Sequence, residues 1–90
     1  MKESSIELQV NRYAKKLGWL VYKFVSPNQR GVPDRIYIKD GKMFFIEFKA
    51  PGNKLTPLQQ VHRRQLMKEM FMVFVVDTVE KGKRIFDAAA

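Results

Sequence analysis

The pair Asp40-Gly41, set between two apolar runs, constrains the fold of this chain more than any other feature. The runs span residues 34–39 and 42–49. An Asp-Gly pair between two such runs is the strongest short-range signal for a β-hairpin, because both residues tolerate positive φ. A two-residue loop would pair Lys39 with Lys42 and would fix the register of both strands.

This register places two carboxylates side by side. Asp34 falls opposite Glu47, and because side chains alternate along a strand, both share one face with Lys49. That face is otherwise apolar, formed by Ile36, Ile38, Met43 and Phe45. Opposed like charges destabilise a sheet, and paired carboxylates raise one pKa or recruit a cation. Mg²⁺ accepts such oxygen ligands together with substrate phosphate. Two interpretations follow: a metal site, or neutralisation of the pair by Lys49.

Length and composition exclude several classes of protein. Ninety residues form one domain, residues 1–90, which is small enough to gain stability from dimerisation. The absence of cysteine excludes disulfides and thiolate zinc sites, and a lone His62 excludes a multi-histidine site within one chain. No apolar run approaches the roughly 20 residues of a membrane span, and the N-terminus lacks a signal-peptide core. We therefore expect a cytoplasmic protein without membrane association.

The charge is strongly positive, with 17 basic residues against 9 acidic ones and a net charge of +8. A basic surface around an acidic pocket favours a polyanion on the surface and a metal ion in the pocket. The alternative is a basic surface without a function.

The N-terminal part predicts a helix and then a strand. Ile6, Val10, Tyr13, Ala14 and Leu17 recur at helical spacing, with Ser4 or Ser5 as the N-cap and Gly18 ending the helix. Residues 19–25 are aromatic and β-branched and predict a strand, within which Lys23 either reaches the site or extends from an edge. Residues 26–33 form a polar loop that leads into Asp34, with Arg30 as a candidate phosphate contact.

The C-terminal half predicts a second helix and a last strand. Thr56, Pro57 and Gln59 match an N-cap, an N1 proline and the reciprocal position of a capping box. Gln59 either closes that box or points at the site. The stripe predicted to face inward is Leu58, Val61, Gln65, Leu66, Glu69 and Met70, with His62, Arg63, Arg64 and Lys68 on the other side.

The last twenty residues are expected to hold one buried strand. Residues 71–76 form an apolar run typical of a strand buried on both faces. Residues 77–84 are predicted as a charged turn region, and Ile85-Phe86 as a short strand or a packed tail. The predicted order is therefore helix, three strands, helix, strand.

These residues together resemble the PD-(D/E)XK nuclease superfamily and, within it, the VRR-NUC branch. The superfamily pattern appears as Pro33-Asp34 and Glu47-Phe48-Lys49. The branch-specific features are the Gly31–Asp34 entry, the Ala50–Gly52 turn, the Leu55–Gln59 helix start and a glutamate in the first helix, Glu7. Arg35 departs from the apolar residue expected after the aspartate. The resemblance implies an α/β (α+β), restriction-endonuclease-like αβββαβ core with a central mixed sheet.

The resemblance also implies a chemistry and its residues. It implies hydrolysis of DNA phosphodiester bonds with Mg²⁺ or Mn²⁺ and no organic cofactor. Asp34, Glu47 and the Phe48 carbonyl would bind the metal, and Glu7 would join the shell directly or through water. Lys49 would orient water or neutralise the transition state, and Gln59 would position water or Lys49.

The same resemblance implies branched DNA as substrate and a homodimer. Pairing of two subunits would use part of the segment from Met70 to Phe86. The DNA contacts expected on the basic surface are Arg30, Lys54, Arg63, Arg64 and Lys23. Two other classes stay open: a DNA-binding module that recognises junctions without cutting them, and a basic structural or RNA-associated protein.

Overall fold

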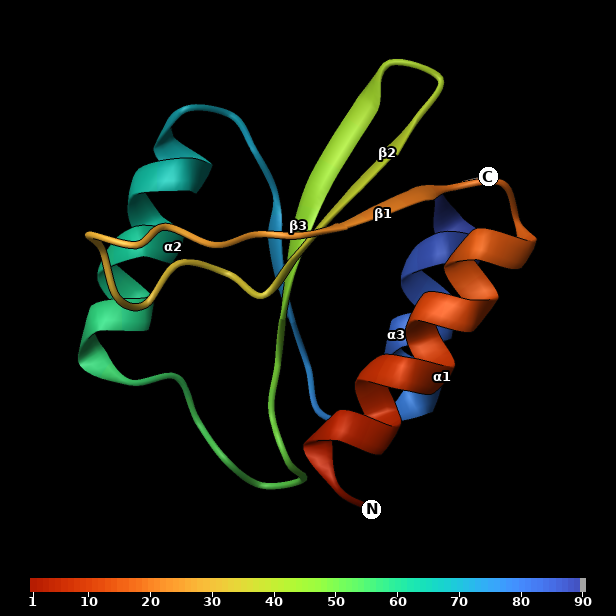
Figure 1. Ribbon diagram of the computed structural model, residues 1–90, viewed down its shortest axis with the longest axis horizontal. Helices are drawn as coiled ribbons and strands as arrows, with labels where there is room; N and C mark the ends of the chain where they lie inside the picture. Colours follow the sequence, from red (N-terminus) through yellow and green to blue (C-terminus); the bar gives the residue numbers. More distant parts are fainter. Residues whose placement is uncertain (90) are drawn as a thin grey trace.

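The computed structural model describes residues 1–89, which form a mixed four-stranded sheet between helices (Figure 1). The order along the chain is α1 (Glu3–Lys16), β1 (Leu20–Lys23), β2 (Arg35–Lys39), β3 (Lys42–Phe48), α2 (Pro57–Lys68), β4 (Val73–Val76) and α3 (Val79–Ala88). The sheet order is β1-β2-β3-β4, with β4 parallel to β3 and the other pairs antiparallel. The predicted α+β class and the order of the first six elements are confirmed.

The hairpin forms in the register that the sequence predicts. Asp40 and Gly41 both have positive φ, 51° and 76°, as a two-residue turn of the primed type requires. Lys39 pairs with Lys42, and the register continues to Arg35 opposite Ile46. The next step along the same register places Asp34 opposite Glu47.

The two faces of the sheet are covered unequally. Figure 1 shows α1 and α3 side by side against one face and α2 against the other. The face under α1 and α3 holds an aromatic core in which Tyr37, Phe44 and Phe86 are buried with ring centroids 5.1–5.4 Å apart. Alternation along β3 then directs Phe45 and Glu47 to the face that carries α2.

Helix α1 is attached to β2 by polar side chains as well as by apolar packing. The hydroxyl of Tyr37 donates a hydrogen bond to the side-chain oxygen of Asn11, and Lys39 Nζ donates to the Leu17 carbonyl at 2.7 Å. Burial raises the pKa of Tyr37, so its hydroxyl stays protonated and remains a donor. These bonds fix the rotation of α1 and so the direction of its remaining side chains.

The N-terminal cap and first strand differ from the prediction in detail. Helix α1 begins at Glu3 with Lys2 as a cap that makes no side-chain hydrogen bond, so Ser4 and Ser5 lie inside the helix. The earlier start places the carboxylate of Glu3 in the first turn, where the helix dipole favours negative charge. Strand β1 is shorter than predicted, and Trp19 belongs to the buried core.

The prediction of a turn over residues 77–84 is wrong, because this segment opens helix α3. Thr78 caps the helix by accepting from the Lys81 N–H at 3.2 Å. Gly82 suggested a turn, yet it lies buried in the helix where α3 meets α1. A Cβ at Gly82 would lie 2.4 Å from Val10 Cγ2, so glycine is required there by close helix packing. Phe86 is a buried residue of α3 rather than part of a strand.

Strand β4 and helix α2 also face their surroundings differently from the prediction. Strand β4 is an edge strand, and Val75 is partly exposed, so it is not buried on both faces. In α2 the less exposed positions are Gln59, His62, Arg63 and Leu66, whereas Leu58 and Val61 are exposed. No residue of α2 is fully buried. The helix is rotated because its N-terminal Gln59 is held by the site described next.

Candidate active site

Asp34 and Glu47 meet where β2 begins and β3 ends. The carboxylate Oδ2 of Asp34 accepts a hydrogen bond from the Phe48 backbone N–H at 2.9 Å. The Asp34 backbone carbonyl accepts from the Phe24 N–H at 2.9 Å, which fixes the backbone at this position. Glu47 is buried, with 4% of its surface exposed. The structure therefore brings the two predicted carboxylates together and orients one of them through the backbone of β3.

The electrostatics of the pair favour a bound positive charge. Burial is the main reason that the pKa of Glu47 rises to about 8, and the charge of Asp34 and a hydrogen bond with it raise the pKa further. The positive charge of Lys49 acts in the opposite direction but does not cancel this effect. At neutral pH the pair thus shares a proton or requires a cation.

We predict that Glu47→Gln stabilises the metal-free protein at alkaline pH. A carboxyl group whose pKa is raised in the folded state binds its proton more tightly there, so stability falls as pH rises from about 4.5 towards 8. The amide removes this dependence and should add roughly 1–3 kcal/mol to the free energy of unfolding at pH 8. The wild type and the variant should differ little at pH 4.5.

Urea unfolding in chelator at both pH values measures this difference. Glu80→Gln is the matched control, because Glu80 is an exposed acid in the first turn of α3. A difference between wild type and Glu47→Gln that does not change with pH would show that Glu47 titrates normally.

Gln59 both closes the capping box and points at the site. Its side-chain oxygen accepts from the Thr56 N–H at 2.9 Å, and its backbone N–H donates to Thr56 Oγ1 at 3.2 Å, which completes the capping box. Its side-chain nitrogen donates to Glu47 Oε2 at 3.3 Å. The first turn of α2 is therefore connected directly to the buried carboxylate.

The two loops around the carboxylates are also positioned by specific contacts. Gly31 has φ of +83°, and a Cβ there would lie 3.0 Å from the Leu58 carbonyl carbon and 3.1 Å from the Gln59 nitrogen. Glycine thus lets the loop before Asp34 rest on the first turn of α2. The Lys49 N–H donates to the Val76 carbonyl at 2.9 Å, which holds the chain after Glu47 against β4.

Glu7 is paired with Arg35 in this structure. Its Oε2 accepts from Arg35 Nε at 2.6 Å, in an ion pair whose side chains are only 24% and 28% exposed. Arg35 is the next residue after Asp34, so alternation directs it to the α1 face of the sheet. The helix acid whose charge raises the pKa of Glu47 is instead Glu3, one turn earlier. The sequence signal for Glu3 is its i, i+4 spacing from Glu7 on the same helix face.

The carboxylate pair fits a hard divalent cation. Two carboxylates that repel one another, one of them buried, supply the oxygen donors that Mg²⁺ and Mn²⁺ prefer. Within residues 1–89 no group of three or more metal-ligating side chains is preassembled. Further ligands would therefore have to come from the backbone, water, substrate or a side chain that moves.

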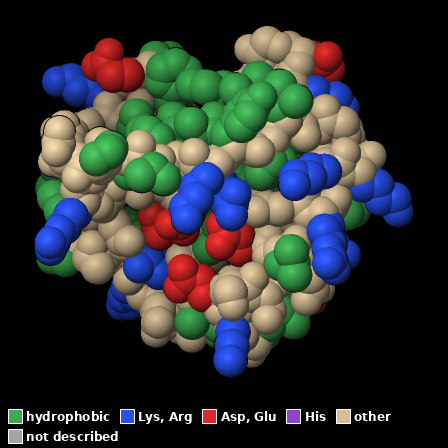
Figure 2. All heavy atoms as spheres, in the orientation of Figure 1, with side chains coloured by type: hydrophobic (Ala, Val, Ile, Leu, Met, Phe, Trp, Pro, Cys, Tyr) green, Lys and Arg blue, Asp and Glu red, His purple; other side chains and the backbone are tan. Residues whose placement is uncertain are grey.

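The residues predicted to contact DNA differ in their exposure and in whether they are already hydrogen-bonded within the protein. Arg30, Lys54 and Arg64 are exposed, and Lys23 is exposed opposite Arg35 in the register. Arg63 is partly buried, and its Nε donates to the Val73 carbonyl at 2.8 Å on the outer edge of β4. Figure 2 shows acidic side chains near the middle of one face of the molecule with lysine and arginine side chains around them.

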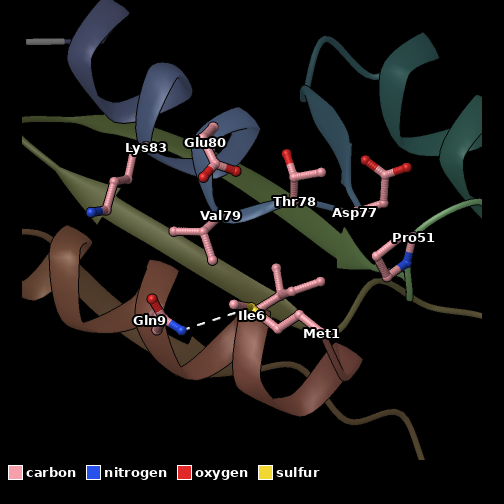
Figure 3. A pocket seen from close by; sticks show the side chains of 9 residues that line it. All are labelled: Met1, Ile6, Gln9, Pro51, Asp77, Thr78, Val79, Glu80 and Lys83. Carbon is pink, nitrogen blue, oxygen red and sulfur yellow. Dashed lines mark hydrogen bonds between the residues drawn. The ribbon is translucent and has the colours of Figure 1, made fainter.

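Beside the site lies a separate hollow of about 290 Å³ (Figure 3). It opens between the start of α1 and the start of α3, and Ile6, Pro51 and Val79 line it. None of the predicted site residues contributes to it. Next to it, the Lys81 ammonium and the Gly52 backbone N–H lower the pKa of Asp77, so this carboxylate anchors the loop that follows Lys49.

Comparison with known proteins identifies relatives of this chain. A protein named "Putative nuclease p44", from Acyrthosiphon pisum secondary endosymbiont phage 1, is 43% identical over 79 residues, which cover 87% of this chain and 85% of that protein. No protein-family profile matches the chain. Among the described residues, no helix has the length and apolar character needed to cross a membrane.

Solved structures share the fold over nearly the whole chain. A structure described as "VRR_NUC domain" superimposes with a TM-score of 0.90 at 24% identity and covers 100% of this chain and 99% of its own. A second, described as "VRR_NUC domain protein", gives a TM-score of 0.79 at 17% identity and covers 97% of this chain and 86% of its own. From the 43% identity to this phage protein we conclude that the chain belongs to the same family as the putative nuclease p44, and its fold is that of the VRR_NUC domain.

Proposed function

We propose that this VRR-NUC protein is a Mg²⁺- or Mn²⁺-dependent endodeoxyribonuclease that acts on branched DNA, such as four-way junctions. The observation that carries the proposal is the pairing of Asp34 with buried Glu47 beside Lys49, within a chain of net charge +8. A structural role for this pair gives no reason to keep two repelling carboxylates at the mouth of a basic surface.

Different residues would bind the metal ion, hold the attacking water and position the carboxylates. Asp34, Glu47 and the Phe48 carbonyl would hold the cation. Glu3, or Glu7 once released from Arg35, would complete the shell directly or through water. When bound, a divalent cation would supply Lewis acidity, which lowers the pKa of a water molecule and stabilises charge on the phosphate. The Lys49 ammonium would hold the attacking water or a phosphate oxygen by donating a hydrogen bond. The Gln59 amide holds the Glu47 carboxylate in place through its 3.3 Å contact.

Basic residues around the site would bind the DNA backbone. Arg30, Lys54, Arg64 and Lys23 are exposed, and their charged groups would donate hydrogen bonds to phosphate oxygens. Arg63 has one nitrogen occupied by the Val73 carbonyl, so only its terminal nitrogens remain for DNA. Binding by such contacts weakens steeply as salt rises, because each neutralised phosphate releases counterions.

A comparison of DNA substrates tests the proposed specificity. Linear duplex, a flap and a four-way junction of equal length are incubated with the protein in Mn²⁺, and the rate of cleavage is measured for each. We expect the junction to be cut fastest. Tight junction binding without cleavage in Mg²⁺ or Mn²⁺ would instead favour the alternative, a DNA-binding module that does not cut.

We predict that Mn²⁺ or Mg²⁺ raises the melting temperature of the DNA-free protein. Bound cation removes the repulsion between Asp34 and Glu47 in the folded state only, so a concentration of 100 times Kd should add about 2.7 kcal/mol of stability. The Asp34→Asn variant should lose most of this shift, measured by thermal melting with and without the ion. A shift of equal size in that variant would place the ion elsewhere.

A homodimer would supply the two sites needed to cut both strands of a junction symmetrically. The segment first expected at the interface is partly internal, because Val73, Val76 and Phe86 are buried within one subunit. Met70, Phe71 and Met72 from that segment are exposed. Leu20 and Tyr22, each 53% exposed, lie on the face of the sheet that α2 leaves largely open.

Phe71 shares the face of Leu20 and Tyr22, because its ring lies 6.4 Å from that of Phe45, whereas Met72 lines a hollow with Phe74 and Ile85 on the α3 side. Figure 1 shows the turn of the hairpin and the C-terminal end of α2 at the top of the molecule. In the same orientation, Figure 2 shows apolar side chains lining a hollow between them. Exposed apolar area of this kind marks a protein interface more often than a neutral surface. We therefore place the two-fold contact on this open sheet face, with a second copy of the chain as the partner.

The predicted dimer has a mass of about twice 10.6 kDa, and Tyr22→Glu is expected to dissociate it. A charge placed in the apolar contact would have to be buried on association, which costs several kcal/mol. Sedimentation at micromolar concentration measures the mass. Leu8→Glu is the control, because Leu8 is 51% exposed on α1, away from the open face. A wild-type monomer that makes paired nicks in a junction would contradict the dimer.

A further inference from the structure

The ion pair between Arg35 and Glu7 has features that packing alone does not require. The pair is short, at 2.6 Å from Nε to Oε2, and both side chains are largely shielded from water. It joins α1 to β2 at the end nearest the carboxylate pair, since Arg35 directly follows Asp34. Helix α1 is already attached to β2 by the Tyr37 and Lys39 hydrogen bonds and by the burial of Ile6 and Val10.

The position of Arg35 separates Glu7 from the site. Arg35 points to the α1 face of the sheet, whereas Asp34 and Glu47 lie on the face that carries α2. Consistent with this, residues 1–89 hold no preassembled cluster of three metal-ligating side chains.

From these contacts we propose that Arg35 is a positioning residue that holds Glu7 away from the carboxylate pair in the DNA-free protein. This inference depends on the proposed function, because it concerns the cation that Asp34 and Glu47 would bind. The Arg35 guanidinium is the counter-ion of the Glu7 carboxylate. A divalent cation at the site must therefore compete with Arg35 for that carboxylate. The free protein therefore binds its cation without Glu7.

A thermodynamic cycle of Mn²⁺ affinities tests the proposal without measuring activity. The wild type, Arg35→Gln, Glu7→Gln and the double variant are titrated with Mn²⁺ in the absence of DNA, and the bound ion is followed by electron paramagnetic resonance. Glu7→Gln should change the affinity of the wild type less than about twofold. In the Arg35→Gln background, where Glu7 is released, the same change should weaken Mn²⁺ binding roughly tenfold.

Non-additive effects of Arg35→Gln and Glu7→Gln on Mn²⁺ affinity would distinguish a positioning role of Arg35 from a simple effect of its charge. Removing Arg35 deletes a positive charge near the site, which raises cation affinity through space even if Glu7 never moves. Such an effect would make the consequence of Glu7→Gln equal in both backgrounds. Lys23→Gln is the matched charge control, because Lys23 lies opposite Arg35 in the sheet register and is not bonded to Glu7. It should leave the Glu7→Gln effect below about twofold.

A substitute variant and the Mn²⁺ affinity of the wild type distinguish failure of the positioning role from failure of the proposed function. If Arg35→Gln fails to fold, Arg35→Met preserves the length and apolar stem of the side chain and enters the same cycle. Equal Glu7→Gln effects in both backgrounds, together with Mn²⁺ binding that depends on Asp34, overturn the positioning role and leave the proposed function standing. Wild-type protein that binds no Mn²⁺ at Asp34 overturns both.

Discussion

Alanine at Asp34, Glu47 or Lys49 is expected to lower the rate of DNA cleavage by roughly 10²- to 10³-fold or more, because each removes a group that acts on the reacting phosphate. The three residues lie at one end of the sheet, where Asp34 accepts from Phe48 and Glu47 is held by Gln59. The exposed basic residues that would bind DNA are separate from them. Each variant should therefore still bind a junction with an affinity close to that of the wild type.

Single-turnover cleavage and a binding assay in chelator measure the two properties separately. Glu80→Ala and Lys16→Ala remove an acidic and a basic side chain that are exposed and outside the proposed machinery, and both should keep the wild-type rate. Loss of DNA binding together with cleavage in Glu47→Ala would indicate that the variant is misfolded or that Glu47 supports binding. Full activity in Glu47→Ala would falsify its assigned role.

The second large effect is expected on stability, at Gly82. A methyl group there would lie 2.4 Å from Val10 Cγ2 and 2.9 Å from Val10 Cγ1, across the contact between α3 and α1. Gly82→Ala should lower the free energy of unfolding by about 1–3 kcal/mol, although alanine alone favours a helix by up to about 1 kcal/mol. Urea unfolding measures the loss.

A compensating substitution provides the control for Gly82. Val10→Ala removes both methyl groups that the new side chain would meet, so the double variant should be more stable than the sum of the two single effects predicts. Glu80→Ala tests the general effect of alanine in α3, where Glu80 is exposed, and should change stability by less than about 0.5 kcal/mol. Strictly additive losses at Val10 and Gly82 would show that the two residues do not meet.

The sequence was sufficient to predict the hairpin and the carboxylate pair, because both depend on local rules. Asp40-Gly41 fixes the turn, the turn fixes the register, and the register places Asp34 beside Glu47. The capping box at Thr56 and Gln59 is local for the same reason. Predictions of this kind need no knowledge of which elements pack together.

The features that the sequence did not predict depend on tertiary contacts. Gly82 between two lysines suggests a turn, and only its approach to Val10 explains a glycine inside α3. The face that α2 presents inward is set by the bonds that Gln59 and Arg63 make with β3 and β4. The pairing of Glu7 with Arg35 follows from the rotation of α1 on the sheet, which no spacing within either segment reveals.

Cleavage of a four-way junction in Mn²⁺, with a parallel reaction in chelator, tests whether Asp34 and Glu47 form a metal-dependent nuclease site. We expect nicking by the wild type in Mn²⁺, none in chelator, and none above background by Glu47→Ala at equal protein and DNA concentrations. Cleavage that persists in chelator, or that Glu47→Ala retains in Mn²⁺, would contradict a metal-dependent site formed by Asp34 and Glu47.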